Sequence, residues 1–569
     1  MTLKRSATPG NIAAILAAVG LAAGAAAVAV PALASTARPG TARPGTVSIP
    51  DVTAPGGMPR LALIRTQSGM TVEGFPTKPG SKNVQVFLDP GIWLAALGAP
   101  LVIDVGRIAY DKPVTITQVL TSPDGKQTTR RLPKGLLDGW NGIKDMVTLT
   151  ARDSAGKTVA VQKETGCLGS YNVARATANS PDNDLYPQGC GAFDPFPLGA
   201  VWGLPKNWAF DPTTFGNPLI LLAGQTYTVT ETIPKTVAHI FHVSAKDATS
   251  SLKVKVTAIK LPPPTASPTA SPTAPPSASA SAALIPSPLP TVTSTADAAG
   301  RPRADAEVPV YQLFSRSAPA AHRPAGPLPA LPAVPEMKNP LASVEPDLVP
   351  LPAWGMNIST QGKHDYLNFS ATVWVGGNGP LDVEAFRHGT NPVMQAYQYF
   401  YKDGKVVGRV RAGTMGFDGA KGHNHWHFEQ FAAYELLGGN KKLIVRSQKV
   451  GFCIAPTDAV DMLVHGALWQ PNYIGLQGQC GSTTALWVRE LMPVGWGDTY
   501  SQNKAGQAFD ITSLPNGKYY VAVIANPGHV LKEVSYHNDV SYRAVILSGK
   551  KGHRHFRVLA YDGIDPERA

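Results

Sequence analysis

A long stretch rich in proline, alanine and serine divides this chain, and it constrains the domain organisation more than any other feature. From Leu261 to Asn339 the sequence contains two Thr-Ala-Ser-Pro repeats and is dominated by small residues and proline. Such a stretch buries too little apolar surface to offset the entropy lost on ordering, so we expect an extended linker. The 569-residue chain is therefore predicted to have two globular domains, residues 47–260 and 340–569.

Both globular domains have the pattern of β structure. Proline (52 residues) and glycine (55) are abundant and only 16% of residues are charged, which favours many turns. Runs rich in β-branched and aromatic residues alternate with turn residues, as in 226–232, 367–375 and 518–524. We predict an all-β fold, with a sandwich-like N-terminal domain of unassigned function and a β-rich C-terminal domain. His239 and His242 lie in an apolar, strand-like run and are expected to be packing residues.

The N-terminus predicts export. Lys4 and Arg5 precede an apolar, alanine-rich run over 12–30, and Ala32-Leu33-Ala34 follows it. This order is typical of a secretory signal over residues 1–34. An uncleaved anchor is the alternative, because the run is almost long enough to span a bilayer.

The charge adds an expectation about partners. The formal net charge of +12 favours association of a secreted protein with anionic cell-wall or matrix polymers, or with the cell surface. The sequence contains no stripe of basic residues interleaved with aromatic residues, so it gives no indication of a nucleic-acid partner.

The four cysteines form one pair in each half of the chain. An oxidising compartment favours disulfides between Cys167 and Cys190 and between Cys453 and Cys480. Each would stabilise the fold by about 3 kcal/mol on the chain-entropy model. Neither cysteine pair has the CxxC spacing that would favour a zinc site.

Three histidines at alternate positions carry the strongest chemical signal. His423, His425 and His427 would lie on one face of a strand, where imidazoles can converge on one metal ion. Neutral imidazole binds Cu(II), Zn(II) and Ni(II), so the spacing does not choose the metal. A surface histidine cluster and a structural zinc site are the alternatives. We expect His553 and His555, near the C-terminus, to lie at the surface.

The motifs around the histidines, from Pro346 to about Leu547, resemble the catalytic domain of the lysyl oxidase family in its bacterial form. Several matching segments follow one another in the family's order, which makes the resemblance specific: Asp347-Leu348-Val349, Gly377-Asn378-Gly379, Tyr434-Glu435-Leu436-Leu437, Lys449 to Cys453, Asp498-Thr499-Tyr500 and Asp510-Ile511-Thr512. The match is poorest over 458–487, and Ala433 stands where vertebrate members carry a histidine.

The resemblance implies a copper ion held by the three histidines and a lysine tyrosylquinone formed by cross-linking Lys449 to Tyr500. Taken alone, Lys449 would be an ordinary surface lysine and Tyr500 a partly buried, hydrogen-bonding tyrosine. For the catalytic base we favour Asp498, two residues from Tyr500, with Glu429 and Asp510 as rivals.

A calcium site is also implied by the resemblance. Oxygen ligands suited to Ca²⁺ would come from the opening strand and from a C-terminal turn, namely from Asp347, the Leu348 carbonyl, Glu533, Asn538 and Asp539. Ser535 replaces an aspartate of the family motif, and a solvated turn is the alternative.

The predicted function is therefore that of a secreted, copper- and quinone-dependent amine oxidase of the protein-lysine 6-oxidase type. It would convert primary amines, peptidyl lysine among them, to aldehydes with O₂, releasing ammonia and hydrogen peroxide. The alternatives are a non-catalytic copper- or zinc-binding surface protein on the same scaffold and a zinc-dependent hydrolase.

Overall fold

The computed structural model describes eight stretches of the chain: residues 55–169, 172–191, 194–213, 217–259, 334–387, 391–419, 424–469 and 480–568. The predicted signal segment, most of the predicted linker and His423 lie outside them. Within these stretches, no helix combines the length and the apolar character that crossing a membrane requires.

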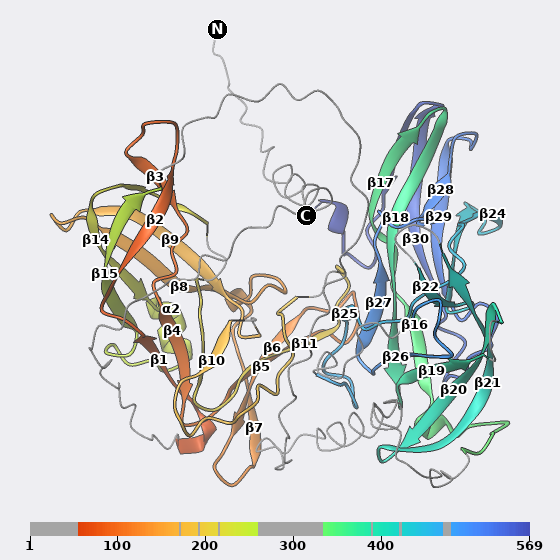
Figure 1. Ribbon diagram of the computed structural model, residues 1–569, viewed down its shortest axis with the longest axis horizontal. Helices are drawn as coiled ribbons and strands as arrows, with labels where there is room; N and C mark the ends of the chain where they lie inside the picture. The colour runs from red at the N-terminus through yellow and green to blue at the C-terminus, as the bar shows by residue number, and fades with distance from the viewer. Residues whose placement is uncertain are drawn as a thin grey trace. The chain divides into compact units, whose positions relative to one another are not determined.

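The predicted all-β fold is confirmed, since strands make up almost all of the regular structure (Figure 1). One helix, α2 (Lys235–Ile240), corrects a detail of the prediction. Pro234 precedes it, so His239 lies in a helix and His242 follows at φ 54°, and both are exposed rather than packed. His553 and His555 lie at the surface, as predicted.

Residues 55–259, which we name the N-terminal β region, contain three sheets around an apolar core. The largest has the order β13-β3-β2-β15-β14-β8-β9, and the two smaller ones have the orders β1-β4-β12-β10 and β11-β5-β6-β7. Their strands are β1 (Arg60–Arg65), β2 (Gly69–Pro76), β3 (Asn83–Val86), β4 (Ile92–Leu97), β5 (Leu101–Gly106), β6 (Thr115–Thr121), β7 (Gln127–Arg131), β8 (Ile143–Arg152), β9 (Thr158–Gly166), β10 (Val173–Arg175), β11 (Gly199–Leu204), β12 (Trp208–Phe210), β13 (Leu219–Leu222), β14 (Thr226–Thr232) and β15 (Thr249–Ala258).

Residues 334–568, the C-terminal β region, contain three further sheets. One follows the order β16-β18-β27-β25, with β17 and β28 also paired to β18; the others are β22-β21-β20-β19-β26 and β24-β23-β29-β30-β31. The strands are β16 (Pro346–Pro350), β17 (Trp354–Gln361), β18 (His364–Gly377), β19 (Leu381–Phe386), β20 (Val393–Lys402), β21 (Lys405–Asp418), β22 (His425–Phe428), β23 (Ala432–Gly438), β24 (Leu443–Arg446), β25 (Asp458–Ala459), β26 (Trp487–Met492), β27 (Trp496–Tyr500), β28 (Ala508–Asp510), β29 (Gly517–Ala525), β30 (Val540–Lys550) and β31 (His553–Val558).

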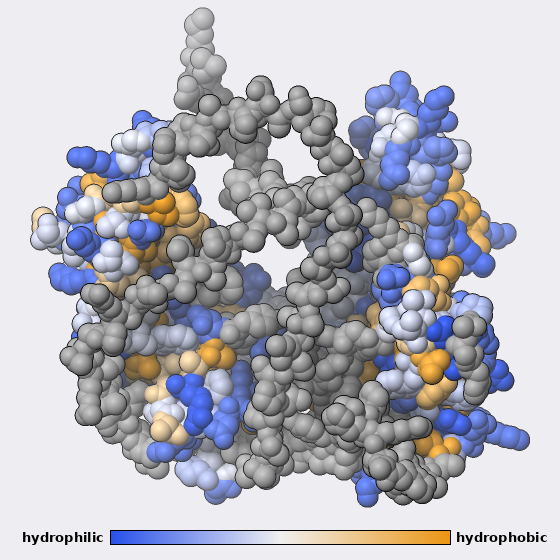
Figure 2. All heavy atoms as spheres, in the orientation of Figure 1, coloured by the Kyte–Doolittle hydropathy of each residue, from blue (hydrophilic) through white to orange (hydrophobic). Residues whose placement is uncertain are grey.

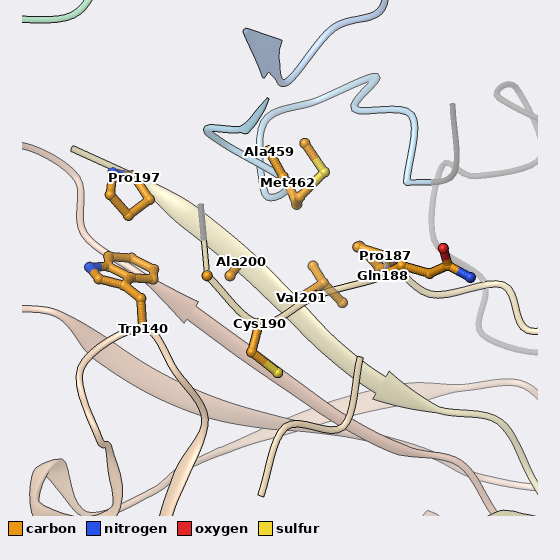
Figure 3. A pocket seen from close by; sticks show the side chains of 11 residues that line it. Trp140, Pro187, Gln188, Cys190, Pro197, Ala200, Val201, Ala459 and Met462 are labelled. Carbon is orange, nitrogen blue, oxygen red and sulfur yellow. The ribbon is translucent and has the colours of Figure 1, made fainter. Parts of the chain in front are cut away.

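Backbone contacts join the two β regions within one compact unit of the chain. The Leu198 N–H donates to the Val460 carbonyl and the Met462 N–H donates to the Gly199 carbonyl, each at 2.8 Å. Position 199 requires glycine, because a Cβ there would lie 2.3 Å from a carboxylate oxygen of Asp461. A small pocket lies here, and Trp140, the β11 residue Val201 and Met462 are among the residues that line it (Figure 3). The domain boundaries inferred from composition stay a prediction.

Both predicted disulfides are present, Cys167–Cys190 in the N-terminal β region and Cys453–Cys480 in the C-terminal one. Among the residues coloured in Figure 2, hydrophobic and hydrophilic side chains are interspersed on the visible face.

Candidate metal and cofactor centre

Two of the three predicted metal ligands lie on β22 and point the same way. His425 pairs with Asp418 of β21 and His427 pairs with Gly416, so the strand alternation puts both imidazoles on one face. Their Nε2 atoms are 2.9 Å apart. Trp426, between them, points to the opposite face and is buried in the core. His423 lies outside the described residues.

The spacing of the two Nε2 atoms fits a shared metal ion. Metal–imidazole bonds of about 2.0–2.1 Å that meet at a right angle leave the two nitrogens about 2.9 Å apart. The Nδ1 atom of His427 lies 3.6 Å from the Asp418 Oδ2 atom, so a carboxylate faces the far side of this ring. A carboxylate in that place orients metal-ligating imidazoles in many proteins.

The described residues supply this histidine pair but no complete ligand set. Within them, no group of three or more His, Cys, Asp or Glu side chains is arranged to hold a metal ion. The pair fits copper through its imidazole chemistry, and a third ligand must come from elsewhere in the chain or from solvent.

Lys449 and Tyr500, the two predicted cofactor residues, lie against each other. The Nζ atom of Lys449 is 4.6 Å from the centroid of the Tyr500 ring and 5.2 Å from that of Phe452. Phe452 meets the Tyr500 ring edge-on at 5.0 Å between centroids. Lys449 is only 7% exposed, so it is not the ordinary surface lysine that its sequence context alone suggests.

Backbone contacts explain how residues far apart in the sequence meet here. Phe452 and Phe428 exchange two backbone hydrogen bonds, of 2.8 and 3.0 Å, which fasten the lysine segment beside the histidine strand. On the same edge of β22, the one that does not pair with β21, the Trp426 N–H donates to the Cys480 carbonyl at 2.8 Å. Cys453 is disulfide-bonded to Cys480, so one covalent link joins the two segments that pair with this edge of the histidine strand.

The Tyr500 hydroxyl is fixed by a single residue of the lysine segment. It accepts a hydrogen bond from the Cys453 N–H at 2.9 Å and donates one to the Cys453 carbonyl at 3.1 Å. Burial, followed by the nearby Asp498 and Glu490, raises the pKa of the Tyr500 phenol well above its usual range. The free side chain is therefore protonated at neutral pH.

Asp498 is the only one of the three predicted base candidates that is buried beside this pair. It is 3% exposed, and its Oδ2 atom has no hydrogen-bond partner within the described structure. Burial raises the pKa of Asp498 well above its usual range, and the Lys449 charge acts in the opposite direction. Burial also lowers the pKa of Lys449, and the charge of Asp498 opposes that shift.

The two rival bases are placed differently. Glu429 is exposed and accepts a hydrogen bond from the Thr414 hydroxyl, and Asp510 is exposed beside His364 and Thr512. Glu490, which the sequence analysis missed, is fully buried and accepts a hydrogen bond from the Ile454 N–H at 3.0 Å. A lone glutamate in an apolar run gives no sequence signal that would single it out.

The residues predicted to bind calcium also lie together. Asp347 accepts hydrogen bonds from the Ser535 N–H and the Asn538 amide, at 3.1 and 2.8 Å. Glu533 accepts one from the Leu348 N–H at 2.8 Å, so the backbone of residue 348 faces this cluster.

The electrostatics of this cluster fit a hard cation, although the set is not spaced as a metal site. Burial raises the pKa of Glu533 to about 8 and that of Asp539 to about 6. Buried oxygens of Asn538 and Asp539 have no hydrogen-bond partner within the described structure. Carboxylate and amide oxygens are the ligands that Ca²⁺ prefers.

The geometry thus defines a β-rich protein with a histidine pair suited to a metal ion and, next to it, a buried lysine facing a tyrosine. Residues 411–555 match the family model for lysyl oxidase, which confirms the resemblance for this part of the C-terminal half. The matched range contains the histidine motif, Lys449 and Tyr500.

Curated relatives support the same family. The chain is 28% identical over 119 residues to lysyl oxidase homolog 2 of Bos taurus and 29% identical over 120 residues to that of Homo sapiens. Each alignment covers 21% of this chain and 13% of the relative. Lysyl oxidase homolog 4 of Mus musculus is 25% identical over 154 residues, which are 27% of this chain and 18% of that protein. The similarity therefore spans less than a fifth of each of these relatives.

Proposed function

We propose that the C-terminal β region is a copper- and quinone-dependent amine oxidase of the protein-lysine 6-oxidase type. The observation that carries the proposal is the Lys449 Nζ atom lying 4.6 Å from the Tyr500 ring centroid, beside the strand of His425 and His427. A hydrolase or a simple metal-binding protein needs no such lysine–tyrosine pair. The family match over 411–555 supports the same activity.

Each residue then has a defined task. His425 and His427, with His423, would hold copper. Cross-linked as lysine tyrosylquinone, Lys449 and Tyr500 would supply an electrophilic carbonyl that condenses with a primary amine and passes electrons to O₂. The products would be an aldehyde, ammonia and hydrogen peroxide.

Asp498 is the base that we propose for removing the proton from the substrate carbon. Its raised pKa makes the ionised carboxylate a stronger base than a surface aspartate. The Cys453 backbone orients the tyrosine through its two hydrogen bonds to the Tyr500 hydroxyl.

We also propose that the substrates are primary amines, with lysine side chains of exported proteins among them, and that the protein is secreted. The signal-like N-terminus supports export, and the predicted disulfides that the structure contains fit an oxidising compartment. Calcium bound by Asp347, Glu533, Asn538 and Asp539 would brace the C-terminal turn against the opening strand β16.

The test is the appearance of a bound quinone. The full chain is expressed, loaded with copper in aerated buffer, and assayed by redox-cycling stain and by its phenylhydrazine adduct. We expect a quinone in the wild type and none in Lys449→Ala or Tyr500→Phe.

Matched controls come from the surface pair Lys518 and Tyr520, where the lysine Nζ also lies over a tyrosine ring, at 4.9 Å. Lys518→Ala and Tyr520→Phe should retain the quinone. A folded, copper-loaded wild type without quinone would refute the oxidase and leave a metal-binding surface protein. Activity with zinc in the absence of O₂ would favour a hydrolase.

A further inference from the structure

A glutamate is buried in the N-terminal β region with no group to satisfy it. Glu231 follows Tyr227 and Val229 on the inward face of β14 and is 0% exposed. Neither of its carboxylate oxygens has a hydrogen-bond partner within the described structure. Burying a carboxylate without a partner is costly, so the position calls for a ligand or a proton.

Three more carboxylates surround this glutamate. Glu231 pairs with Leu149 of β8, and Leu149 pairs with Gln162 of β9, so these side chains lie side by side on one face. Glu164, two residues along β9 and on the same face, also has a buried carboxylate oxygen without a partner. Asp89 and Asp211 come from loops that follow β3 and β12.

The loop carboxylates are already held in place. The Asp211 Oδ1 atom accepts hydrogen bonds from the Thr213 N–H and hydroxyl, both at 2.8 Å, and Oδ2 accepts one from the Asn172 amide. Asp89 is in direct side-chain contact with Asp211. Two carboxylates in contact repel each other when both are ionised.

Burial and neighbouring negative charges raise the pKa values of three of these four carboxylates, Glu164, Asp211 and Glu231. Burial, followed by the charges of Asp211, Asp89 and Glu164, raises the pKa of Glu231 to about 9. Burial is also the main cause that raises the pKa values of Glu164 and Asp211. The neighbouring charges that raise these three pKa values are those of other carboxylates of the cluster.

A solvent-open pocket of about 90 Å³ leads to Asp89 and Glu164 of this cluster. Its lining offers carboxylate, amide and hydroxyl oxygens among apolar side chains: Phe87, Leu88, Asp89, Leu149, Gln162, Glu164, Thr213 and Asn217. An ion from solvent can therefore reach the cluster.

We propose that Asp89, Glu164, Asp211 and Glu231 form a Ca²⁺ site in the N-terminal β region. The donors are all oxygens, the preference of a hard cation, and no cysteine or histidine belongs to the set. No three carboxylates of the described chain are yet spaced as metal ligands, so binding must draw Glu164 and Glu231 toward the two aspartates. Ca²⁺ tolerates such irregular, adjustable coordination better than Mg²⁺ does.

The test counts Ca²⁺ bound to the full chain by equilibrium dialysis with ⁴⁵Ca and follows the thermal midpoint with and without Ca²⁺. All proteins carry Asp347→Asn, which removes the negative charge and one of the two carboxylate oxygens of Asp347 from the separate C-terminal cluster. Glu231→Gln and the exposed Asp89→Asn should each weaken binding about tenfold or more and lose the thermal shift. The matched control is Glu73→Gln, at an exposed position of the same sheet. This variant should keep both the Ca²⁺ binding and the thermal shift.

Two outcomes would overturn the site. Ca²⁺ binding that is equal in the parent protein and in Asp89→Asn excludes these oxygens as ligands, and because Asp89 is exposed this variant does not depend on repacking the core. A thermal midpoint that rises in Glu231→Gln, together with a parent protein that binds no Ca²⁺, would show that Glu231 is simply a buried, protonated acid.

Discussion

Gly451 lies against His427, one of the proposed metal ligands, and adding one methyl group at Gly451 should damage the proposed metal site without changing any of its ligands. A Cβ at this position would lie 2.8 Å from the His427 Cβ and 3.0 Å from its Nδ1. Carbon atoms at rest lie about 3.5–4.0 Å apart, so the imidazole must move by on the order of 1 Å. Metal sites lose function at displacements of about 0.5 Å.

We expect Gly451→Ala to lower the copper affinity about 10- to 100-fold and to cost about 1–3 kcal/mol of stability through overpacking. Copper affinity is measured by competition with a chromogenic chelator, and stability by urea unfolding of the metal-free protein. Gly419→Ala is the control, because among the described residues its Cβ would meet only Phe417, at 3.8 Å. A Gly451→Ala protein with unchanged copper affinity would refute the placement of the metal at His427.

Two further predictions concern pH and redox state. Burial and then the charge of Asp458 raise the pKa of Asp194 to about 8. The contribution of Asp194 to stability is therefore fully present below its pKa in the unfolded chain, about 3.9, and is lost as the pH rises through 8. The free energy of unfolding should fall by about 1.4 kcal/mol per pH unit between these two pKa values. The urea midpoints at pH 5 and pH 8 should therefore differ less in Asp194→Asn than in the wild type. An equal dependence of the midpoint on pH in both proteins would contradict this. Replacing both Cys453 and Cys480 with serine should cost about 3 kcal/mol and lower copper affinity, as unfolding and metal titration will measure, whereas unchanged affinity would show that the disulfide does not support the site.

The parts of the site that follow local rules could be predicted from the sequence. Alternation along a strand was enough to place His425 and His427 on one face, and the pairing of four cysteines into two disulfides followed from their distribution. The proximity of Lys449 and Tyr500 could not be derived in this way. They are brought together by pairing between strands and loops distant in sequence, and only the family resemblance indicated it.

The errors and omissions have physical causes too. Pro234 began a helix where the apolar pattern suggested a strand around His239. Glu490 and Glu231 gave no signal, because a single acidic residue in a strand is usually exposed and only the packing of other elements buries it.

One edge of the strand that carries the histidines is held by Phe452 and Cys480, and a single disulfide between Cys453 and Cys480 links these two neighbours. We therefore expect the thiol chemistry of the surroundings to affect the assembly of the proposed metal site. In a reducing cytosol the bond would not persist, this edge would loosen, and the histidines would lose their alignment. The proposed oxidase would then acquire its metal site only after the proposed export, which would protect the producing cell from hydrogen peroxide generated inside it.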